Sequence, residues 1–235
     1  MKVAETLVVV AQGKELHPLV ASFAAAGHQP RSMTLGRLEC HVVDEPGLLL
    51  AVGGHGKAQM AAQTQHLIEH GAGLRIVLCA GAAGCLGEGL KLGDIAVGTS
   101  TIEHDYKLRL VRRASPRHEP DPRLLGEFRS AASGIAGEAR VHFGPIASGN
   151  EDVIDPSRAR ELREATGAVC AAWEGAGAAR AASFSGRAFL EVRAITDGAD
   201  HTAAADFEAN LARSMPNLGR LLVAWSLSGS RRAWD

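Results

Sequence analysis

Three acidic side chains in this sequence stand where an apolar stretch of chain ends, a place from which a side chain can reach a ligand. They are Glu15, Glu174 and Asp197, and Arg193 and Thr196 belong to the same stretch as Asp197. Burial and neighbouring charges shift the pKa values of such groups, which suits them to proton transfer in an active site. The pattern alone leaves a second interpretation open. A charged pair that closes a core strand is often a structural ion pair, and the helix dipole favours an acid such as Glu15 in a first helical turn.

Glycines cluster directly after two of the apolar stretches. The first group comprises Gly53, Gly54 and Gly56, and the second comprises Gly81, Gly84, Gly87, Gly89 and Gly93. In α/β proteins ligands bind beyond the carboxyl ends of strands, where glycine lets the backbone approach them closely. Tight turns alone would also explain these glycines. Neither group has the spacing of a phosphate-binding loop or of the G-x-G-x-x-G motif, and no cofactor is expected.

The elements that must position these residues alternate along the chain. Strands are predicted over residues 7–11, 48–52, 76–79, 95–97, 169–172 and 188–195, and helices over 15–26, 57–70, 158–165 and 207–226. Alternating strands and helices favour an α/β fold with three layers, in which helices cover both faces of a central sheet. Continuous apolar strands indicate burial on both sides, so we expect a mixed but mostly parallel sheet. No linker divides the chain, which predicts one domain over residues 1–235.

The composition of the chain argues against some classes of binding partner. The formal net charge is −1 and no segment carries a large block of one sign, which argues against nucleic acid or a membrane surface as a partner. No apolar run reaches the roughly 18 residues that a membrane-spanning helix needs. The four cysteines form no C-x-x-C pair, and Cys79 and Cys170 lie in apolar stretches. This usage is typical of a reducing compartment and predicts a cytoplasmic protein.

Several segments together resemble a known family. They are GGHGKAQMAAQ (53–63), CAGAAGCLGEGLKLGDIAVG (79–98), EHD (103–105), SGNEDVI (148–154), AAWEGAGAARAA (171–182) and VRAITDGAD (192–200). Their order is similar to that of the nucleoside phosphorylase family, and within it to the methylthioadenosine/S-adenosylhomocysteine nucleosidases. The likeness extends over nearly the whole chain. It implies the phosphorylase/hydrolase-like fold and cleavage of the bond between a purine base, adenine in these nucleosidases, and ribose.

The resemblance assigns roles to the charged residues. Asp197 matches the acid that protonates or hydrogen-bonds the purine N7, so that the base leaves neutral; such general acid help is typically worth about 10²–10⁴-fold in rate. Glu174 matches the acid that accepts hydrogen bonds from the ribose 2′- and 3′-hydroxyls and stabilises positive charge on the sugar. Glu15 matches the base that activates water, and Arg193 the group that holds that water and the carboxylates.

The resemblance also implies a set of substrate-binding positions. Besides Glu174 they are Trp173, Thr196, Gly81, Ala82, Asp152, Val153 and His55. Three of them depart from the pattern of the nucleosidases. Trp173 replaces a methionine under the ribose, Ala82 replaces a serine near the water, and His55 stands where an apolar residue lines the pocket for the 5′ substituent.

The attacking nucleophile has to be argued separately, because phosphorylases and hydrolases share this family. A phosphorylase of the family carries an arginine just before the glycine-rich segment, and here residues 77–80 are all uncharged. The carboxylate of Glu15 would also repel a bound phosphate. Hydrolysis is therefore favoured, while Lys14 and Arg193 keep phosphorolysis open.

The departures make the 5′ substituent the open question. His55 and the basic segment Tyr106, Lys107, Leu108, Arg109, Leu110, Val111, Arg112, Arg113 suggest a group more polar or acidic than methylthio, of the AMP or futalosine type. A solvated basic loop is the alternative. The resemblance further implies a homodimer, in which this segment of one subunit closes the 5′ pocket of the other.

Two other interpretations are less favoured. A catalytically inactive ligand-binding protein on this fold would need no acid at each of the positions 15, 174 and 197. Residues 66–70 match the H-x-x-E-H zinc pattern, but no third ligand is evident, so no metal is expected and these histidines are interpreted as a solvated helix face.

Overall fold

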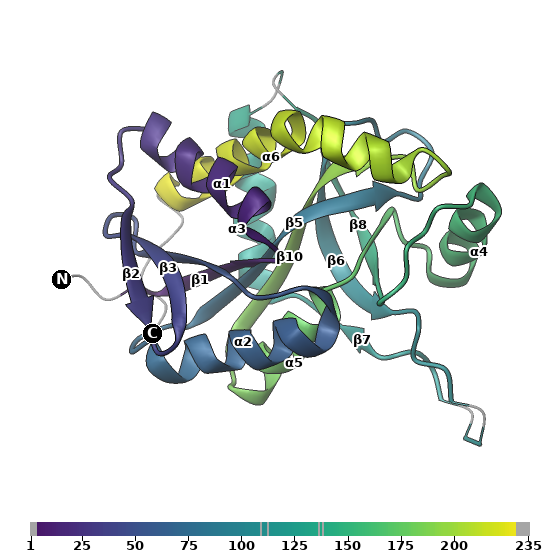
Figure 1. Ribbon diagram of the computed structural model, residues 1–235, viewed down its shortest axis with the longest axis horizontal. Coiled ribbons are helices and arrows are strands. Elements are labelled where there is room, and N and C mark those ends of the chain that lie inside the picture. Colours follow the sequence, from purple (N-terminus) through teal and green to yellow (C-terminus); the bar gives the residue numbers. More distant parts are fainter. Residues whose placement is uncertain (1–3, 109, 112, 136, 138, 229–235) are drawn as a thin grey trace.

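A mixed β-sheet of ten strands runs through the computed structural model, which describes residues 4–108, 110–111, 113–135, 137 and 139–228 (Figure 1). The strands are β1 (Thr6–Val10), β2 (Arg31–Leu35), β3 (Leu38–Val43), β4 (Leu48–Val52), β5 (Ile76–Cys85), β6 (Ile95–Glu103), β7 (Arg117–His118), β8 (Val141–Ser148), β9 (Cys170–Ala172) and β10 (Ala188–Asp197). The helices are α1 (Gly13–Ala25), α2 (Gly56–His70), α3 (Pro122–Ala132), α4 (Pro156–Thr166), α5 (Gly175–Phe184) and α6 (Ala203–Leu227). The α/β prediction is confirmed.

The direction of the strands changes across the sheet. Strands β4, β1, β5 and β10 are parallel neighbours, as are β6, β8 and β9. The pairs β2–β3, β3–β4, β10–β6, β5–β9 and β6–β7 are antiparallel. The mixed sheet is therefore as expected, but antiparallel pairings are as frequent as parallel ones among the described residues.

One half of the sheet closes on itself. Strand β10 pairs with both β5 and β6, and the path β6–β8–β9 leads back to β5. These five strands form a distorted barrel, whereas β1 to β4 continue as an open sheet. An open stack of three layers, as predicted, therefore describes only part of the molecule.

Helices pack on both faces of the open part of the sheet because its strands are apolar on both sides (Figure 1). In β1, Val8 and Val10 belong to the core formed with α1, α3 and α6. Leu7 and Val9 point to the other face and belong to the core formed with α2 and α5. No helix among the described residues is long and apolar enough to span a membrane.

Local sequence signals explain where several elements begin and end. The side chains of Asp121 and Asp155 accept backbone N–H groups at the starts of α3 and α4, where proline occupies the first turn. Gly167 ends α4 in the left-handed conformation, with φ of 69°. Strand β5 runs six residues beyond its predicted end at Cys79, so Gly81 and Gly84 lie inside a strand and not after it.

Candidate active site

A cavity of about 560 Å³ opens at the carboxyl ends of β1, β4, β5 and β10. Glu15 and Asp197 line it, together with most of the predicted substrate-binding residues, namely Glu174, Trp173, Thr196, Ala82, Asp152, Val153 and His55. Arg193 and Gly81 lie behind its wall. Segments that are far apart in the sequence thus bring the predicted site residues together.

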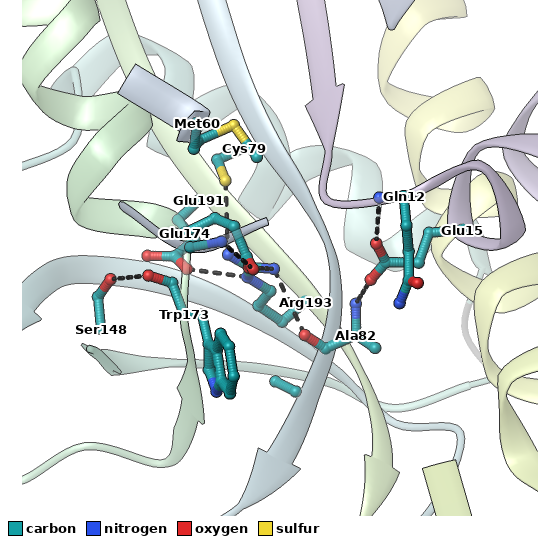
Figure 2. Close-up of polar contacts among 12 residues, drawn as sticks. Gln12, Glu15, Met60, Cys79, Ala82, Ser148, Trp173, Glu174, Glu191 and Arg193 are labelled. Carbon is teal, nitrogen blue, oxygen red and sulfur yellow. Dashed lines mark hydrogen bonds and ion pairs between the residues drawn. The ribbon is translucent and has the colours of Figure 1, made fainter. Parts of the chain in front are cut away.

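Glu15 enters the cavity from the first turn of α1. Its Oε2 atom accepts the backbone N–H of Gln12, the N-cap residue, at 3.1 Å, which forms half of a capping box. Its Oε1 atom accepts the backbone N–H of Ala82 in β5 at 2.8 Å (Figure 2). The side chain is buried, and this burial, reinforced by the nearby carboxylate of Glu174, raises the pKa of Glu15 to about 7. A carboxylate with such a pKa is suited to accept a proton near neutral pH.

Gly81 leaves the room that this contact needs. A Cβ atom at position 81 would lie 2.8 Å from Oε1 of Glu15 and 2.9 Å from Nη1 of Arg193, and the φ angle of Gly81 is +151°. The absence of a side chain at Gly81 therefore lets β5 approach Glu15 and Arg193 closely.

Glu174 lies between two helix starts. It is the N-cap residue of α5, and its Oε1 atom accepts the backbone N–H of Gly56, the first residue of α2, at 3.3 Å. Its Oε2 atom accepts Nη1 of Arg193 at 3.3 Å. The amide donor at the start of α2 and the guanidinium thus hold both carboxylate oxygens of Glu174 in place.

Asp197 stands at the end of β10, on the side of the cavity that also includes Asp152 and Val153. Its Oδ2 atom accepts the hydroxyl of Thr196 and its Oδ1 atom accepts the backbone N–H of Ala199, both at 3.0 Å. Burial is the main cause that raises the pKa of Asp197 above its usual range. A carboxyl group of this kind is able to hold a proton and to donate it.

Arg193 is fully buried and lies between Glu174 and Ala82 (Figure 2). Besides Glu174, its Nη1 atom donates to the carbonyl oxygen of Ala82 at 3.4 Å, and Nη2 contacts Sγ of Cys79 at 3.4 Å. Burial opposes its charge, but surrounding negative groups, including Glu191, Glu174 and Glu15, outweigh it and keep the pKa of the guanidinium well above its usual value. Arg193 therefore stays a cation between carboxylates.

An aromatic pair and an anchored loop complete the cavity. The rings of His55 and Trp173 lie 4.6 Å apart between centroids. The loop with Asp152 and Val153 is held at its start, because Glu151 accepts Nε and Nη2 of Arg158 at 2.6 and 2.8 Å. This ion pair anchors the start of the loop to α4.

Comparisons with known proteins identify the family of the chain. The family model described as the phosphorylase superfamily matches residues 5–225. The chain belongs to the phosphorylase superfamily. Curated relatives include the 5′-methylthioadenosine/S-adenosylhomocysteine nucleosidases of Shewanella halifaxensis, 24% identical over 89% of this chain and 94% of that protein, and of Shewanella oneidensis, 28% identical over 85% and 88%.

Solved structures of the superfamily share the fold. The 5′-methylthioadenosine/S-adenosylhomocysteine nucleosidase of Neisseria meningitidis, in complex with methylthio-immucillin-A, superposes with a TM-score of 0.83 at 26% identity and covers 96% of this chain and 98% of its own. The futalosine hydrolase of Helicobacter pylori gives a TM-score of 0.83 at 24% identity, with 95% and 97% covered.

Two polar side chains of the site, Glu191 and Gln12, were not predicted from the sequence. Glu191 is buried in β10 and binds Arg193, and Gln12 lines the cavity beside Glu15. An acidic residue in the otherwise apolar stretch 188–192 was a signal for Glu191. Gln12 carried no signal, because polar residues are ordinary at a helix start.

The histidines of the H-x-x-E-H pattern have structural contacts. Nε2 of His66 accepts the backbone N–H of Arg37 at 2.9 Å, and Nδ1 of His70 lies 2.9 Å from the carbonyl oxygen of His66. Within the described ranges no group of three or more His, Cys, Asp or Glu side chains is arranged to hold a metal ion.

Proposed function

We propose that this chain hydrolyses the N-glycosidic bond of a 5′-substituted adenine nucleoside, releasing adenine and the ribose derivative. The observation that carries the proposal is the convergence of Glu15, Glu174 and Asp197 on one cavity. The curated relatives, which are named as nucleosidases for methylthioadenosine and S-adenosylhomocysteine, support the same reaction and the adenine base.

In the proposed reaction the bond between C1′ and the purine N9 breaks, and its electron pair moves into the base. Asp197 donates its proton to N7, so that adenine leaves neutral. Glu174 binds the ribose 2′- and 3′-hydroxyls, and its charge stabilises the oxocarbenium-like sugar. Glu15 takes a proton from the water whose oxygen bonds to C1′. Asp197 ends deprotonated and Glu15 protonated, and exchange with solvent restores both.

Electrostatics favour water over phosphate as the nucleophile. The Ala82 N–H, a donor that could bind a phosphate oxygen, is already accepted by Oε1 of Glu15 at 2.8 Å. Arg193, the buried cation at this place, is shared by Glu174 and Glu191. A phosphate dianion would therefore meet carboxylates and little uncompensated positive charge, and it would be repelled.

The direct test of the proposal is Asp197→Asn, with Asp200→Asn as the matched control. Asp200 lies three residues away and does not line this cavity. We expect the Asp197 variant to release adenine about 10²–10⁴ times more slowly, because the leaving base loses its proton donor. The Asp200 variant should stay within a few-fold of the parent. A coupled assay of adenine release measures both, and full activity of Asp197→Asn would refute the role.

For the 5′ substituent we propose a polar group. Besides His55, the cavity wall carries Gln12, and Glu208 pairs with Lys14 near the same end of α1. Arg109 and Arg112, which are also candidates to meet this group, lie outside the described residues. Kinetics with methylthioadenosine, S-adenosylhomocysteine, a futalosine-type nucleoside and AMP test the proposal. A preference for methylthioadenosine that survives His55→Ala would contradict it.

We further propose that the protein is a cytoplasmic homodimer with no nucleic-acid or membrane partner. All four cysteines are free, as in a reducing compartment. The segment between β6 and β7 projects from the body of the molecule and exposes Leu108, Leu110 and Val111 (Figure 1). Docked on a second copy, it would cover apolar surface near the exposed Ile154 at the cavity. Sedimentation equilibrium should give a dimer for the parent and a monomer for Leu108→Glu/Leu110→Glu; a monomeric parent would contradict it.

A further inference from the structure

Glu191 is a buried carboxylate that the proposed reaction does not use. It lies in β10 two residues before Arg193, so both side chains point to the same face of the strand. Its side chain is fully enclosed by the protein. A charge in such a place is unfavourable unless it is paired, so its partners indicate what it does.

The partners of Glu191 hold it in one orientation (Figure 2). Its Oε1 atom accepts Nε of Arg193 at 2.8 Å, and its Oε2 atom accepts the hydroxyl of Thr101 in β6. Gly175 at the start of α5 leaves the space that the carboxylate occupies, because a Cβ atom there would lie 2.1 Å from Oε2. Three elements therefore shape a place for this one side chain.

Glu191 is also the nearest hydrogen-bonding partner of Arg193. The other contacts of the guanidinium, with Glu174, Ala82 and Cys79, are 3.3–3.4 Å long, against 2.8 Å for Glu191. A charge-assisted hydrogen bond of normal length fixes a planar guanidinium more firmly than longer contacts do. The hydrogen bond from Nε of Arg193 to Glu191 therefore fixes the plane of the guanidinium. This orientation in turn directs Nη1 towards Glu174.

We propose that Glu191 is a positioning residue, which fixes the guanidinium of Arg193 and offsets its charge, so that Glu15 stays basic enough to take a proton from water. The proposal rests on the hydrolysis proposed above. Its reason is the balance of charge. The cation Arg193 lies near both Glu15 and Glu174. Without the carboxylate of Glu191, its full positive charge would act on Glu15 and make Glu15 a weaker base.

Charged groups from each element around Glu15 enter this balance. Glu174 of α5 raises the pKa of Glu15, and Arg193 of β10 lowers it, as do the N–H groups of Ala82 and Gln12. Cys79 of β5 contacts Arg193 as a buried thiol, whose pKa burial raises far above neutral, so it adds no charge. Because the pKa of Glu15 is about 7, the rate should fall with acid below about pH 7.

The test is the pH profile of kcat/KM for Glu191→Gln. Glutamine keeps the shape and the hydrogen bond from Arg193, but it removes the charge. We expect the acid limb of the profile to move about one unit to lower pH, because the uncompensated guanidinium lowers the pKa of Glu15. Above the limb kcat should fall about tenfold, since Glu15 becomes a weaker base. An acid limb at the position of the parent would overturn the proposal.

Glu127→Gln is the matched control. Glu127 is equally buried, and it accepts the indole N–H of Trp225 at 3.0 Å far from the cavity. This variant should lose stability without any shift of the profile. A shift in Glu127→Gln as large as in Glu191→Gln would show that the readout reports stability only.

Thr101→Val is a second variant that tests the same proposal if the Glu191→Gln protein does not fold. It removes the hydroxyl that holds Oε2 and leaves the charge of Glu191 in place. We expect kcat to fall several-fold with the acid limb unchanged, because the guanidinium is held less firmly. A folded Thr101→Val protein with full kcat would contradict the positioning role. If the parent itself releases no adenine, the proposed function fails and this inference fails with it, whereas an active parent with an unshifted Glu191→Gln profile overturns this inference alone.

Discussion

At the scale of single residues, the site depends on three carboxyl groups that have different hydrogen-bonding partners. Glu15 is buried with two backbone N–H donors, while Glu174 meets both a guanidinium and the start of a helix. Asp197 is buried and accepts hydrogen bonds from Thr196 and Ala199. Burial raises the pKa values of Glu15 and Asp197, which suits both carboxyl groups to the proton transfers of the proposed reaction.

Burial of Glu15 has a consequence for stability. Its pKa of about 7 in the native state exceeds its value of 4.5 in the unfolded chain, so the native state binds more protons between these values. The contribution of Glu15 to stability is therefore fully present below about pH 4.5 and is lost as pH rises through 7. The shift corresponds to about 3 kcal/mol.

We predict that the parent loses about 3 kcal/mol of unfolding free energy relative to Glu15→Gln between pH 4.5 and pH 8. Urea unfolding of both proteins at a series of pH values measures this difference, in which the other titrating groups cancel. The Glu15→Gln protein should also lack hydrolase activity. A difference that is constant over this range would mean that folding does not raise the pKa of Glu15.

At the scale of elements, close approach of backbone segments places the site. The residues Gly56 and Lys57 begin α2 beside α5, and a Cβ atom on Gly177 would lie 2.2 Å from the carbonyl oxygen of Lys57. This contact sets the distance between Glu174, at the start of α5, and the N–H of Gly56 that it accepts. A larger residue at position 177 would push the two helices apart.

We predict that Gly177→Ala destabilises the protein by about 1–3 kcal/mol and weakens substrate binding, because it overpacks the α2–α5 contact. Gly126→Ala is the matched control, since Gly126 also lies in a helix but has open space around it. That variant should gain about 0.5–1 kcal/mol through higher helix propensity. Chemical unfolding and the KM for adenine nucleosides check both; a neutral Gly177→Ala would disprove the tight contact.

Elements with a strong local pattern, such as a continuous apolar run, could be predicted from the sequence. Buried strands such as β1 and β4 and helices such as α2 carry local signals, and their predicted bounds agree closely with the structure. The hairpin β2–β3 was missed because β2 has no buried side chain and β3 mixes buried with exposed residues, so neither strand forms a continuous apolar run. Strand β8 was missed because Gly144 and Pro145 interrupt it.

At the scale of the whole molecule, long-range pairing decided what the sequence could not predict. Strand β5 continues through its glycines because β10 pairs with it as far as Gly84 and Asp197. The contact of Glu191 with Thr101 joins residues 90 positions apart, and no local pattern indicates it. The acids at 15, 174 and 197 were predictable through the likeness of whole segments to a family, and their convergence then follows from strand order. The single domain over residues 1–235 stays a prediction.

The charge balance of the cavity as a whole predicts which nucleophile the enzyme uses. Arg193 is hydrogen-bonded to Glu174 and Glu191, and the nearby Glu15 also helps to keep the pKa of its guanidinium well above the usual value. A neutral water molecule enters such a site at little electrostatic cost, whereas a phosphate dianion does not.

The most direct test of this account is the rate of adenine release from a 5′-substituted adenosine in buffer free of phosphate. We predict full activity without phosphate, a product sugar that is not phosphorylated, and no acceleration when phosphate is added. Release that begins only after phosphate is supplied, with a ribose 1-phosphate as product, would contradict hydrolysis.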